Sequence, residues 1–208
     1  MEPIGATRRI TGAERRQRIL EAAANAFASR GYHATSVEVV AEAAGITKPV
    51  VYDHFPSKRH LYIEVLESTR EELLARGVAA LGADAPSRER IRAAIDAFFA
   101  YVEENPAPAR VLLTPPAGEP DLAELSRRVQ LVATSRIAEL LEREPDLLPG
   151  ARNRKRRIEL FVAFIQQGAH GLAVWWADHP EVRRKSLVDA TMDLVWDGIG
   201  NQFSTHRS

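Results

Sequence analysis

The chain has 208 residues, and its 28 Lys and Arg side chains balance 28 Asp and Glu side chains, so the formal net charge is +0. A neutral chain is not a general binder of polyanions, and the absence of cysteine excludes disulfides, thiolate metal sites and cysteine nucleophiles. No apolar run reaches the roughly 18 residues of a membrane span, and the first residues lack the apolar core of a signal peptide. We therefore expect a cytoplasmic protein with no membrane partner.

The charge is distributed unevenly along the chain. Residues 1–60 carry nine Lys and Arg side chains against six Asp and Glu, a balance of +3, and the remainder carries −3. A locally basic segment on a neutral protein indicates either one specialised face or ordinary scatter of charge.

The first two helices are predicted from capping residues and apolar spacing. Residues 13–31 place their apolar side chains on one helical face. Thr11 and Glu14 form a potential capping box at its start, and Gly31 is expected to end it. Ser36 is in position to cap the second helix.

A third helix is unusually short and contains a proline. Gly45 ends the second helix, Thr47 can cap the third, and Pro49 falls in the first turn, where its missing N–H is not needed. Val51 and Phe55 are spaced to face inward, so the other side chains from Lys48 to His54 are left for the surface. Such a helix after a Gly-containing turn is typical of a helix-turn-helix unit that reads DNA.

The remaining segments are also helical in their periodicity. Ser57 caps a long fourth helix, and amphipathic patterns follow over residues 88–105, 109–113, 121–143, 154–179 and 181–203. We find no convincing alternating strand and no internal repeat. The sequence predicts an all-α fold with about nine helices.

Two stretches of the N-terminal third carry a specific pattern. They are "RILEAAANAFASRGY" and "VAEAAGITKPVVYDHFPSKRHLY", with Thr35 and Ser36 between them. A Gly-aromatic helix end, a Thr before the second helix, an A-x-x-A-G-[VI] turn and a [VL]-Y-x-H-F-x-[SN]-K run occur without gaps. From about Ile19 to Leu66 the chain resembles the TetR family of transcriptional repressors. That resemblance implies a protein that binds a double-stranded DNA operator.

The resemblance also implies roles for individual residues. Lys48, Val50 and Asp53 match positions that reach base edges or nearby phosphates, Pro49 matches an apolar base contact, and Tyr52 and His54 match phosphate and sugar contacts. Thr35 and Ser36 lie where a hydroxyl and a helix N-terminus meet a phosphate, Thr47 begins the reading helix, and Lys58 matches a phosphate-binding lysine. Asp53 departs from the pattern, because phosphate repels a carboxylate. It either accepts a hydrogen bond from a cytosine amino group or faces solvent.

Arginines cluster before the first apolar residue of the first helix. Arg8, Arg9, Arg15, Arg16 and Arg18 form a basic arm and first turn. Such an arm either enters the minor groove and neutralises phosphates, or remains a solvated tail.

The resemblance implies two domains and a homodimer. Residues 1–56 would bind DNA, with residues 1–10 as a flexible arm, and residues 57–208 would bind an effector and pair the subunits. The last two helices carry wide apolar stripes and small residues, which suit a four-helix interface about a two-fold axis. The interface residues that we predict are Phe161, Ile165, Gly168, Leu172, Leu187, Ala190 and Leu194. The alternative is that these residues form an intramolecular core.

Aromatic and polar side chains in the same region predict a small-molecule site. Buried amides and a buried His in an apolar helix are unusual unless they are paired, and an aromatic pocket with a few polar groups is typical of ligand sites. The predicted lining is Phe98, Phe99, Phe161, Phe164, Gln167, His170 and Trp175. The His170 and Gln167 pair could equally be a polar contact across the dimer seam.

The expected function is that of a transcriptional repressor released from a palindromic operator by a small-molecule inducer. An activator, or an adaptor that binds DNA without a ligand, is compatible with the same residues. The sequence contains no His-Glu-x-x-His, phosphate-loop or Gly-x-Ser-x-Gly motif and no paired metal-ligand spacing. We therefore expect no enzymatic activity, no cofactor and no metal.

Overall fold

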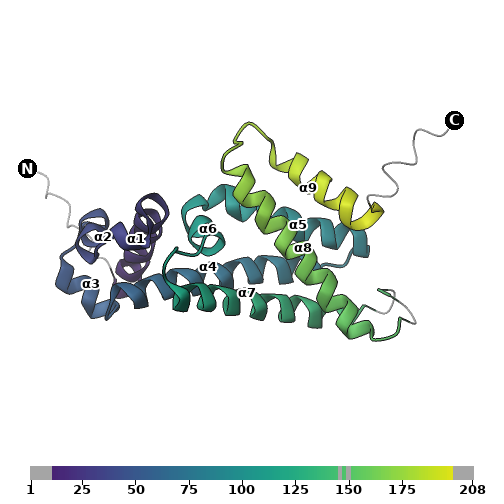
Figure 1. The fold of residues 1–208 in the computed structure, drawn as a ribbon, viewed down its shortest axis with the longest axis horizontal. Helices are drawn as coiled ribbons and strands as arrows, with labels where there is room; N and C mark the ends of the chain where they lie inside the picture. The colour runs from purple at the N-terminus through teal and green to yellow at the C-terminus, as the bar shows by residue number, and fades with distance from the viewer. Residues whose placement is uncertain (1–10, 145–146, 149–150, 199–208) are drawn as a thin grey trace, which may run out of the picture. The chain divides into compact units, whose positions relative to one another are not determined.

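The computed structural model describes residues 11–144, 147–148 and 151–198. Within them it contains nine α-helices, one short π-helix and no strand, which confirms the all-α prediction (Figure 1). The helices are α1 (Gly12–Ala34), α2 (Val37–Ala44), α3 (Lys48–His54), α4 (Lys58–Leu81), α5 (Ser87–Glu104), α6 (Pro106–Leu113), α7 (Pro120–Leu141), α8 (Arg154–Trp176), α9 (Arg184–Met192) and the π-helix Asp193–Asp197. No helix in these described ranges is long and apolar enough to cross a membrane.

The chain forms two compact units, and the boundary between them falls inside α4. The N-terminal unit ends at Val65 and the C-terminal unit begins at Leu66, nine residues later than the boundary that we predicted at the start of the fourth helix. The first turns of α4 belong to the N-terminal unit because Leu61 and Tyr62 are buried there. The Tyr62 ring packs edge-on against Phe27, with 5.2 Å between ring centroids.

Local signals define the helix ends of the N-terminal unit. The Thr11 amide donates to Glu14 Oε2 over 2.7 Å and the Glu14 amide donates to Thr11 Oγ1 over 3.1 Å, which is the predicted capping box. Gly31, with a φ of 80°, interrupts α1, and Gly45, with a φ of 67°, ends α2. Both conformations lie in a region that side chains other than glycine rarely adopt.

The predicted cap at Thr47 is wrong in one respect. Thr47 precedes α3, but its side chain makes no capping hydrogen bond. An N-cap side chain normally accepts from the amide of the second or third helical residue. The second residue of α3 is Pro49, which has no amide N–H, so half of the usual partners are missing.

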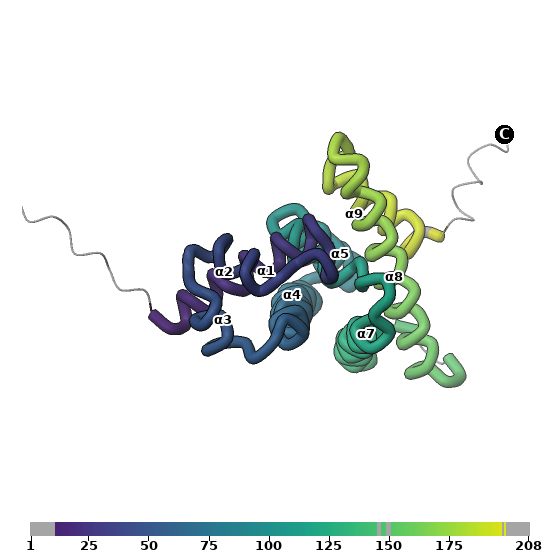
Figure 2. The backbone as a smooth tube through the Cα atoms, turned by 60° about the vertical axis from the view of Figure 1, so that its left-hand side comes forward, coloured from purple at the N-terminus to yellow at the C-terminus, as the bar shows by residue number. Residues whose placement is uncertain are grey.

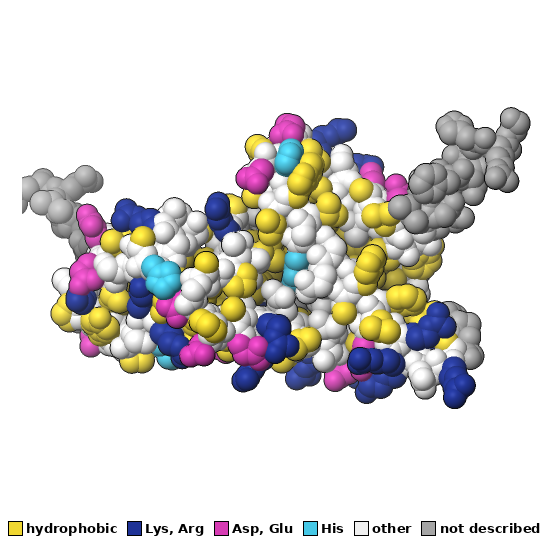
Figure 3. Space-filling model, viewed as in Figure 1, with side chains coloured by type: hydrophobic (Ala, Val, Ile, Leu, Met, Phe, Trp, Pro, Cys, Tyr) yellow, Lys and Arg dark blue, Asp and Glu magenta, His cyan; other side chains and the backbone are white. Residues whose placement is uncertain are grey.

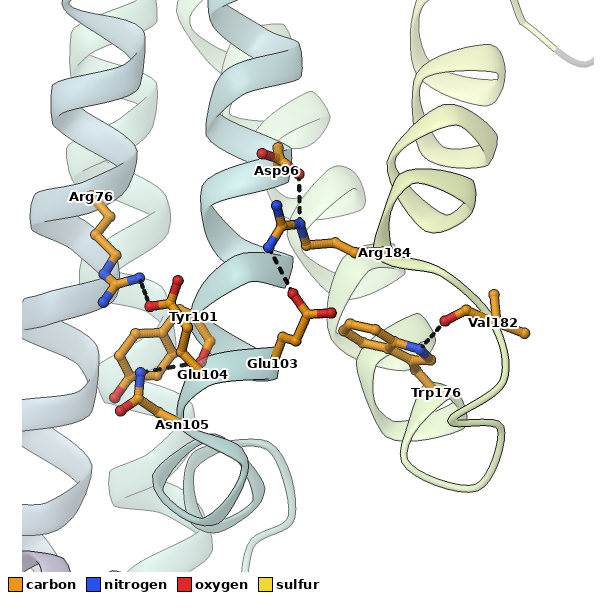
Figure 4. Close-up of polar contacts among 9 residues, drawn as sticks. All are labelled: Arg76, Asp96, Tyr101, Glu103, Glu104, Asn105, Trp176, Val182 and Arg184. Atoms are coloured by element: carbon orange, nitrogen blue, oxygen red, sulfur yellow. Dashed lines mark hydrogen bonds and ion pairs between the residues drawn. The ribbon is translucent and has the colours of Figure 1, made fainter.

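The C-terminal unit is held by a core between α5, α8 and α9 and by polar contacts at its edge. Its fully buried members include Phe99, Ala173 and Met192. Arg184 at the start of α9 donates to Asp96 Oδ1 over 3.0 Å and to Glu103 Oε2 over 2.7 Å, both on α5 (Figure 4). On α8, the Trp176 indole N–H donates to the Val182 carbonyl over 2.7 Å and closes the connection to α9 (Figure 4).

Within this unit α4 and α7 run side by side. Figure 2 looks nearly along both helices, and Figure 1 shows them both lengthwise, so their axes are close to parallel. Helix α8 crosses them obliquely (Figure 1).

The last helix is shorter than predicted. The pattern over residues 181–203 becomes α9 (Arg184–Met192) and the π-helix that follows it, ending at Gly198 with a φ of 75°. Residues 199–203 lie outside the described residues.

Candidate nucleic-acid interface and ligand cavity

Helix α3 presents polar side chains on one side and packs the other into the N-terminal unit. Val51 and Phe55 are each only 1% exposed, as predicted. Thr47, Lys48, Pro49, Tyr52 and Asp53 are exposed, and Val50 and His54 are half-buried. The short helix therefore has one face committed to the core and one face that is free to enter a groove.

Lys48 is already paired in the absence of DNA. Its ammonium forms an ion pair with Glu38 on α2 and lies 5.8 Å from the centre of the Tyr52 ring. The hydrogen bond from Lys48 holds the pKa of the Glu38 carboxyl down at about 2, so the pair persists at neutral pH. A base contact by Lys48 would either use its remaining donors or replace the contact with Glu38.

The predicted phosphate contact by the Thr35 hydroxyl does not fit the structure. Thr35 is 1% exposed, and its hydroxyl lies 3.1 Å from the Ala26 carbonyl and 2.8 Å from the Gly31 carbonyl. The side chain is therefore turned inward, toward two carbonyls of α1. Ser36 is the exposed member of the pair, and its Oγ accepts from the Val39 amide over 3.3 Å at the start of α2.

Lys58 also has an intramolecular role that the sequence did not indicate. Its ammonium donates to the Tyr32 carbonyl over 3.0 Å and lies 4.4 Å from the centre of the Tyr32 ring. This half-buried lysine satisfies a carbonyl at the end of α1 and binds the aromatic face. Any phosphate contact by Lys58 would use its remaining donors.

Only part of the predicted basic arm lies among the described residues. Arg8 and Arg9 lie outside the described residues. Arg16 forms an ion pair with Glu64 on α4, and its guanidinium lies 5.1 Å from the centre of the Phe55 ring. Arg16 therefore joins α1 to the rest of the N-terminal unit.

The C-terminal unit contains a cavity of about 160 Å³ that is partly open to the surface. Its wall comes from α4, α5, α6, α7 and α8 and is predominantly apolar, with Leu74, Leu81, Ile91, Ile137 and Leu141 among the lining residues. Four polar side chains also reach it, namely Arg70, Gln130, Gln166 and His170. This combination fits an apolar molecule with a small polar part.

The structure places only two of the predicted lining residues at the cavity. Phe98 and His170 line it, with 5.4 Å between their ring centroids. Phe99 is buried in the core beside it and is 0% exposed. The other four predictions are wrong because their side chains are on the outside: Phe161, Phe164, Gln167 and Trp175 are all exposed.

Gln166, and not Gln167, is the amide of α8 that lines the cavity, although the predicted lining names only Gln167. Successive residues of a helix point about 100° apart, so Gln166 and Gln167 face different surroundings. Gln166 lines the cavity and accepts a hydrogen bond from the Thr134 hydroxyl, whereas Gln167 is exposed. The signal available in the sequence was its position four residues before His170, which puts both on one helical face.

Burial keeps His170 neutral. Desolvation lowers the pKa of its imidazole to about 4. At neutral pH His170 can therefore donate one hydrogen bond and accept one, but it brings no charge to the cavity.

The opposite face of α8 is apolar and exposed. Phe164 is 73% exposed, and Leu160, Phe161, Val174 and Trp175 share that face. Gly168 and Gly171 lie between them, and a methyl group added at either would meet nothing within 4 Å. Figure 3 shows hydrophobic side chains over the surface of α8 and α9. An apolar face of this kind on a helix commonly marks a protein interface.

Some of the predicted interface residues are exposed, and others are turned toward the cavity or the core. Phe161, Gly168, Ala190 and Leu194 are exposed, as an interface needs. Leu187 is 4% exposed and belongs to the core of the unit, which excludes it. Ile165 lines the cavity and Leu172 packs against the core, so both are turned inward.

A helix-turn-helix unit with an exposed face on its second helix defines a class of DNA-binding protein. Residues 19–65 match the family described as bacterial regulatory proteins, tetR family, and residues 86–196 match the tetracyclin repressor-like C-terminal domain. The chain belongs to the TetR family of transcriptional regulators, whose members are not enzymes.

Relatives match along nearly the whole chain. The HTH-type transcriptional activator FasR of Mycolicibacterium smegmatis is 30% identical over 203 residues, covering 96% of this chain and 90% of FasR. The HTH-type transcriptional repressor KstR2 of Rhodococcus jostii is 35% identical over 202 residues, covering 90% and 92%. The family thus includes proteins named as activators and proteins named as repressors.

Solved structures share the fold at low sequence identity. The fatty acid degradation regulator FadR of Bacillus halodurans superposes with a TM-score of 0.79 at 18% identity, covering 92% of this chain and 98% of that one. FadR of Bacillus subtilis, solved in complex with stearoyl-CoA, has a TM-score of 0.73 at 17% identity, covering 88% and 98%.

Proposed function

We propose that the protein is a homodimeric repressor that binds a near-palindromic operator through α3 and is released when an effector with a long apolar part fills the cavity. The observation that carries this proposal is the cavity itself. A helical unit of this size can pack without a cavity, and apolar lining that is not packed against other atoms lowers stability. A bound molecule would supply the missing contacts.

Two copies of α3 are needed to read a palindrome. In a dimer, recognition helices about 34–36 Å apart meet successive major grooves on one side of the DNA. The exposed apolar face of α8, together with Ala190 and Leu194, supports pairing by a second copy, because in a two-fold dimer the same face of each subunit meets its counterpart. Lys48, Pro49, Val50 and Tyr52 are the side chains that we assign to base and backbone contacts.

Helix α4 supports coupling between the two functions. Its first turns carry Leu61, Tyr62 and Val65 of the N-terminal unit, and the same continuous helix carries Arg70 to Leu81 along the cavity wall. A ligand that prefers one arrangement of α4 shifts the population of the DNA-binding state. Coupling free energies of this kind are typically about 1–3 kcal/mol.

The effector that we propose is a single-chain apolar molecule. The cavity wall is predominantly apolar and extends along α4 from Arg70 to Leu81, which is roughly 16 Å at the rise of an α-helix. The stearoyl-CoA bound by the Bacillus subtilis FadR, which has the same fold, carries such a chain.

Activation is the second candidate function. FasR, which matches 96% of this chain, is named as an activator. Operator contacts would be the same in both cases, and the position of the operator relative to the promoter would decide the sign of regulation.

The first experiment is selection of bound sequences from a random DNA pool by the purified full chain at a stated salt concentration. Enrichment of a near-palindrome with half-sites about one helical turn apart is expected. Recovery of no motif, with only salt-sensitive binding to all sequences, would contradict operator recognition. Binding of the selected site is then measured by fluorescence anisotropy with and without a long-chain alkyl probe, and unchanged affinity at saturating probe would contradict effector control.

A further inference from the structure

The cavity has two chemically different ends. At one end, Arg90 connects α4 to the residues that follow α7. Its Nη1 donates to the carbonyl of Leu81, the last residue of α4, over 3.0 Å. The same Nη1 donates to Oε1 of Glu144, just beyond α7, also over 3.0 Å. The C-terminal ends of α4 and α7 therefore meet at this end. Leu81 and Leu141 line the cavity here, so this end is apolar.

Arg70 and Gln130 lie at the opposite end. On α4, Arg70 precedes Leu81 by eleven residues, and on α7, Gln130 precedes Leu141 by eleven residues. Arg70 and Gln130 are the polar residues that line the cavity from these two helices. Because α4 and α7 run side by side in the same direction, eleven residues place both side chains roughly 16 Å from the apolar end.

Helix α8 brings two more polar groups to the same end. It runs opposite to α7, since Val162 packs beside Ile137 and Leu141, whereas Gln166, one turn later, accepts from the Thr134 hydroxyl. His170 is a further turn along and so approaches the level of Gln130. The carbonyl oxygen of Gln166 is occupied by Thr134, which leaves its amide N–H groups as donors.

Arg70 is the single cation among the side chains that line the cavity, and one of its donors is unsatisfied. Its Nη2 forms a 3.4 Å ion pair with Glu71 Oε1 on the neighbouring residue, whereas its Nε is buried and has no hydrogen-bond partner. A buried N–H without an acceptor is costly, and a ligand oxygen that accepts from it would remove this cost. A compact carboxylate matches the planar fork of its N–H groups.

We propose that the cavity binds a single-chain carboxylate, with its head group paired to Arg70 beside Gln166 and His170 and its alkyl chain extending toward Leu81 and Leu141. This inference rests on the proposed function, which supplies the effector, and adds the chemistry of the head group. Arg70 lies five residues after Val65, the last residue of the N-terminal unit. The head group therefore binds the segment of α4 that directly follows the N-terminal unit in the chain. A neutral chain of equal length would lack the ion pair with Arg70.

Isothermal titration calorimetry on the full chain tests the head group with matched probes. The two charged probes are used below their micelle concentrations and the methyl ester below its solubility. Dodecanoate, methyl dodecanoate and dodecanoyl-CoA share one alkyl chain, which is comparable in length to the cavity wall. The chain is larger than the 160 Å³ of the cavity, so its binding requires the lining side chains to move apart. We expect the wild-type protein to bind dodecanoate at least tenfold more tightly than the methyl ester. Arg70→Gln should abolish this preference by weakening dodecanoate binding tenfold or more, with methyl ester binding changed less than twofold. Arg70→Lys should restore part of it.

The controls separate this inference from the proposed function. Arg136→Gln, which removes an exposed arginine on the outer side of α7, should leave all three affinities unchanged. Unaltered methyl ester binding shows that an Arg70 variant is folded. Equal binding of dodecanoate by the wild type and Arg70→Gln would overturn the head-group assignment and leave effector binding intact, as would tighter binding of dodecanoyl-CoA that is independent of Arg70. Failure of every probe to bind would overturn the proposed function as well.

Discussion

The two units of this protein treat apolar surface in opposite ways. Among the described residues, large exposed apolar side chains fall almost entirely in the C-terminal unit, and Tyr52 is the only one in the N-terminal unit. The N-terminal unit buries its apolar groups and shows a mostly polar face on α3. The C-terminal unit leaves apolar surface open inside, at the cavity, and outside, along α8. The first unit is structurally complete before it meets DNA, whereas the second has two apolar surfaces that remain to be covered.

The largest expected effect concerns the outer face of α8. Replacing Phe164 by Asp should shift the protein from dimer to monomer, because a charge would be buried where an aromatic ring contributes about 1.5–3 kcal/mol per copy. Sedimentation equilibrium should show dimerisation weakened by about 100-fold or more, with operator affinity falling in parallel. Val78→Asp places the same charge on an exposed apolar position of α4 and should leave the dimer intact. A dimeric Phe164→Asp variant would mean that the outer face of α8 is covered by something other than a second copy.

A smaller effect is expected at the inner surface, from the titration of His170. Its pKa is lowered to about 4 in the folded chain, below the value of about 6.5 in the unfolded chain, so the unfolded state binds more protons between these values. Its contribution to stability is fully present above pH 6.5 and is lost as the pH falls toward 4, by at most about 3 kcal/mol.

Urea unfolding at a series of pH values measures this effect. The difference in unfolding free energy between the wild type and His170→Gln should shrink from pH 7 to pH 4 and stay constant below it. A difference that is independent of pH over this range would show that His170 is solvated, and would remove one polar group from the polar end of the cavity.

A substitution at Thr35 tests whether its hydroxyl stabilises the N-terminal unit or binds DNA. Thr35→Val keeps the shape of the side chain and removes the hydroxyl that serves the Ala26 and Gly31 carbonyls, so it should destabilise the protein by about 1–2 kcal/mol. Thermal unfolding measures the loss, and operator affinity below the unfolding transition should be unchanged. A variant of normal stability that binds its operator weakly would restore the phosphate contact that the resemblance implied.

The smallest expected effect is that of Lys58→Ala. Loss of the contacts with the Tyr32 carbonyl and ring should lower stability by about 1 kcal/mol. We expect the remaining donors of Lys58 to meet no phosphate, so the slope of log affinity against log salt for operator binding should be nearly unchanged. A slope reduced by about one unit would assign Lys58 to a phosphate instead.

The accuracy of the sequence-based predictions follows the same division between the units. In the N-terminal unit, Thr11 and Glu14, Gly31 and Gly45 act through backbone geometry within a few residues, so the helix ends could be predicted from sequence. The inward side of α3 was also predictable, because Val51 and Phe55 are the apolar residues at helical spacing. The orientation of Lys58 was not, since the Tyr32 carbonyl that it binds lies 26 residues away in the chain. The inward turn of Thr35 toward the Gly31 carbonyl is a local contact, but the resemblance favoured a phosphate instead.

On α8 the sequence predicted that apolar and polar residues matter but not which direction each one faces. The apolar residues cover most of the helix surface, so periodicity does not separate the cavity, the core and the outer face. Phe164 was predicted to line the ligand site, but it is the most exposed of the large apolar residues among the described residues. Leu187 on α9 was predicted to lie in the interface, but it is buried. Arg70 was not singled out at all, because an arginine in a charged stretch of α4 looks like a solvated residue until the cavity is known.

By itself, the sequence determined the all-α class, the helix-turn-helix unit and the family, because these depend on short-range spacing of caps, glycines and apolar residues. Tertiary structure alone decided that Arg70, Gln130, Gln166 and His170 share one end of a cavity, and that the two faces of α8 meet different surroundings. Helices from distant parts of the chain create these environments through their packing. A side chain's surroundings then depend on neighbours that its own segment does not encode.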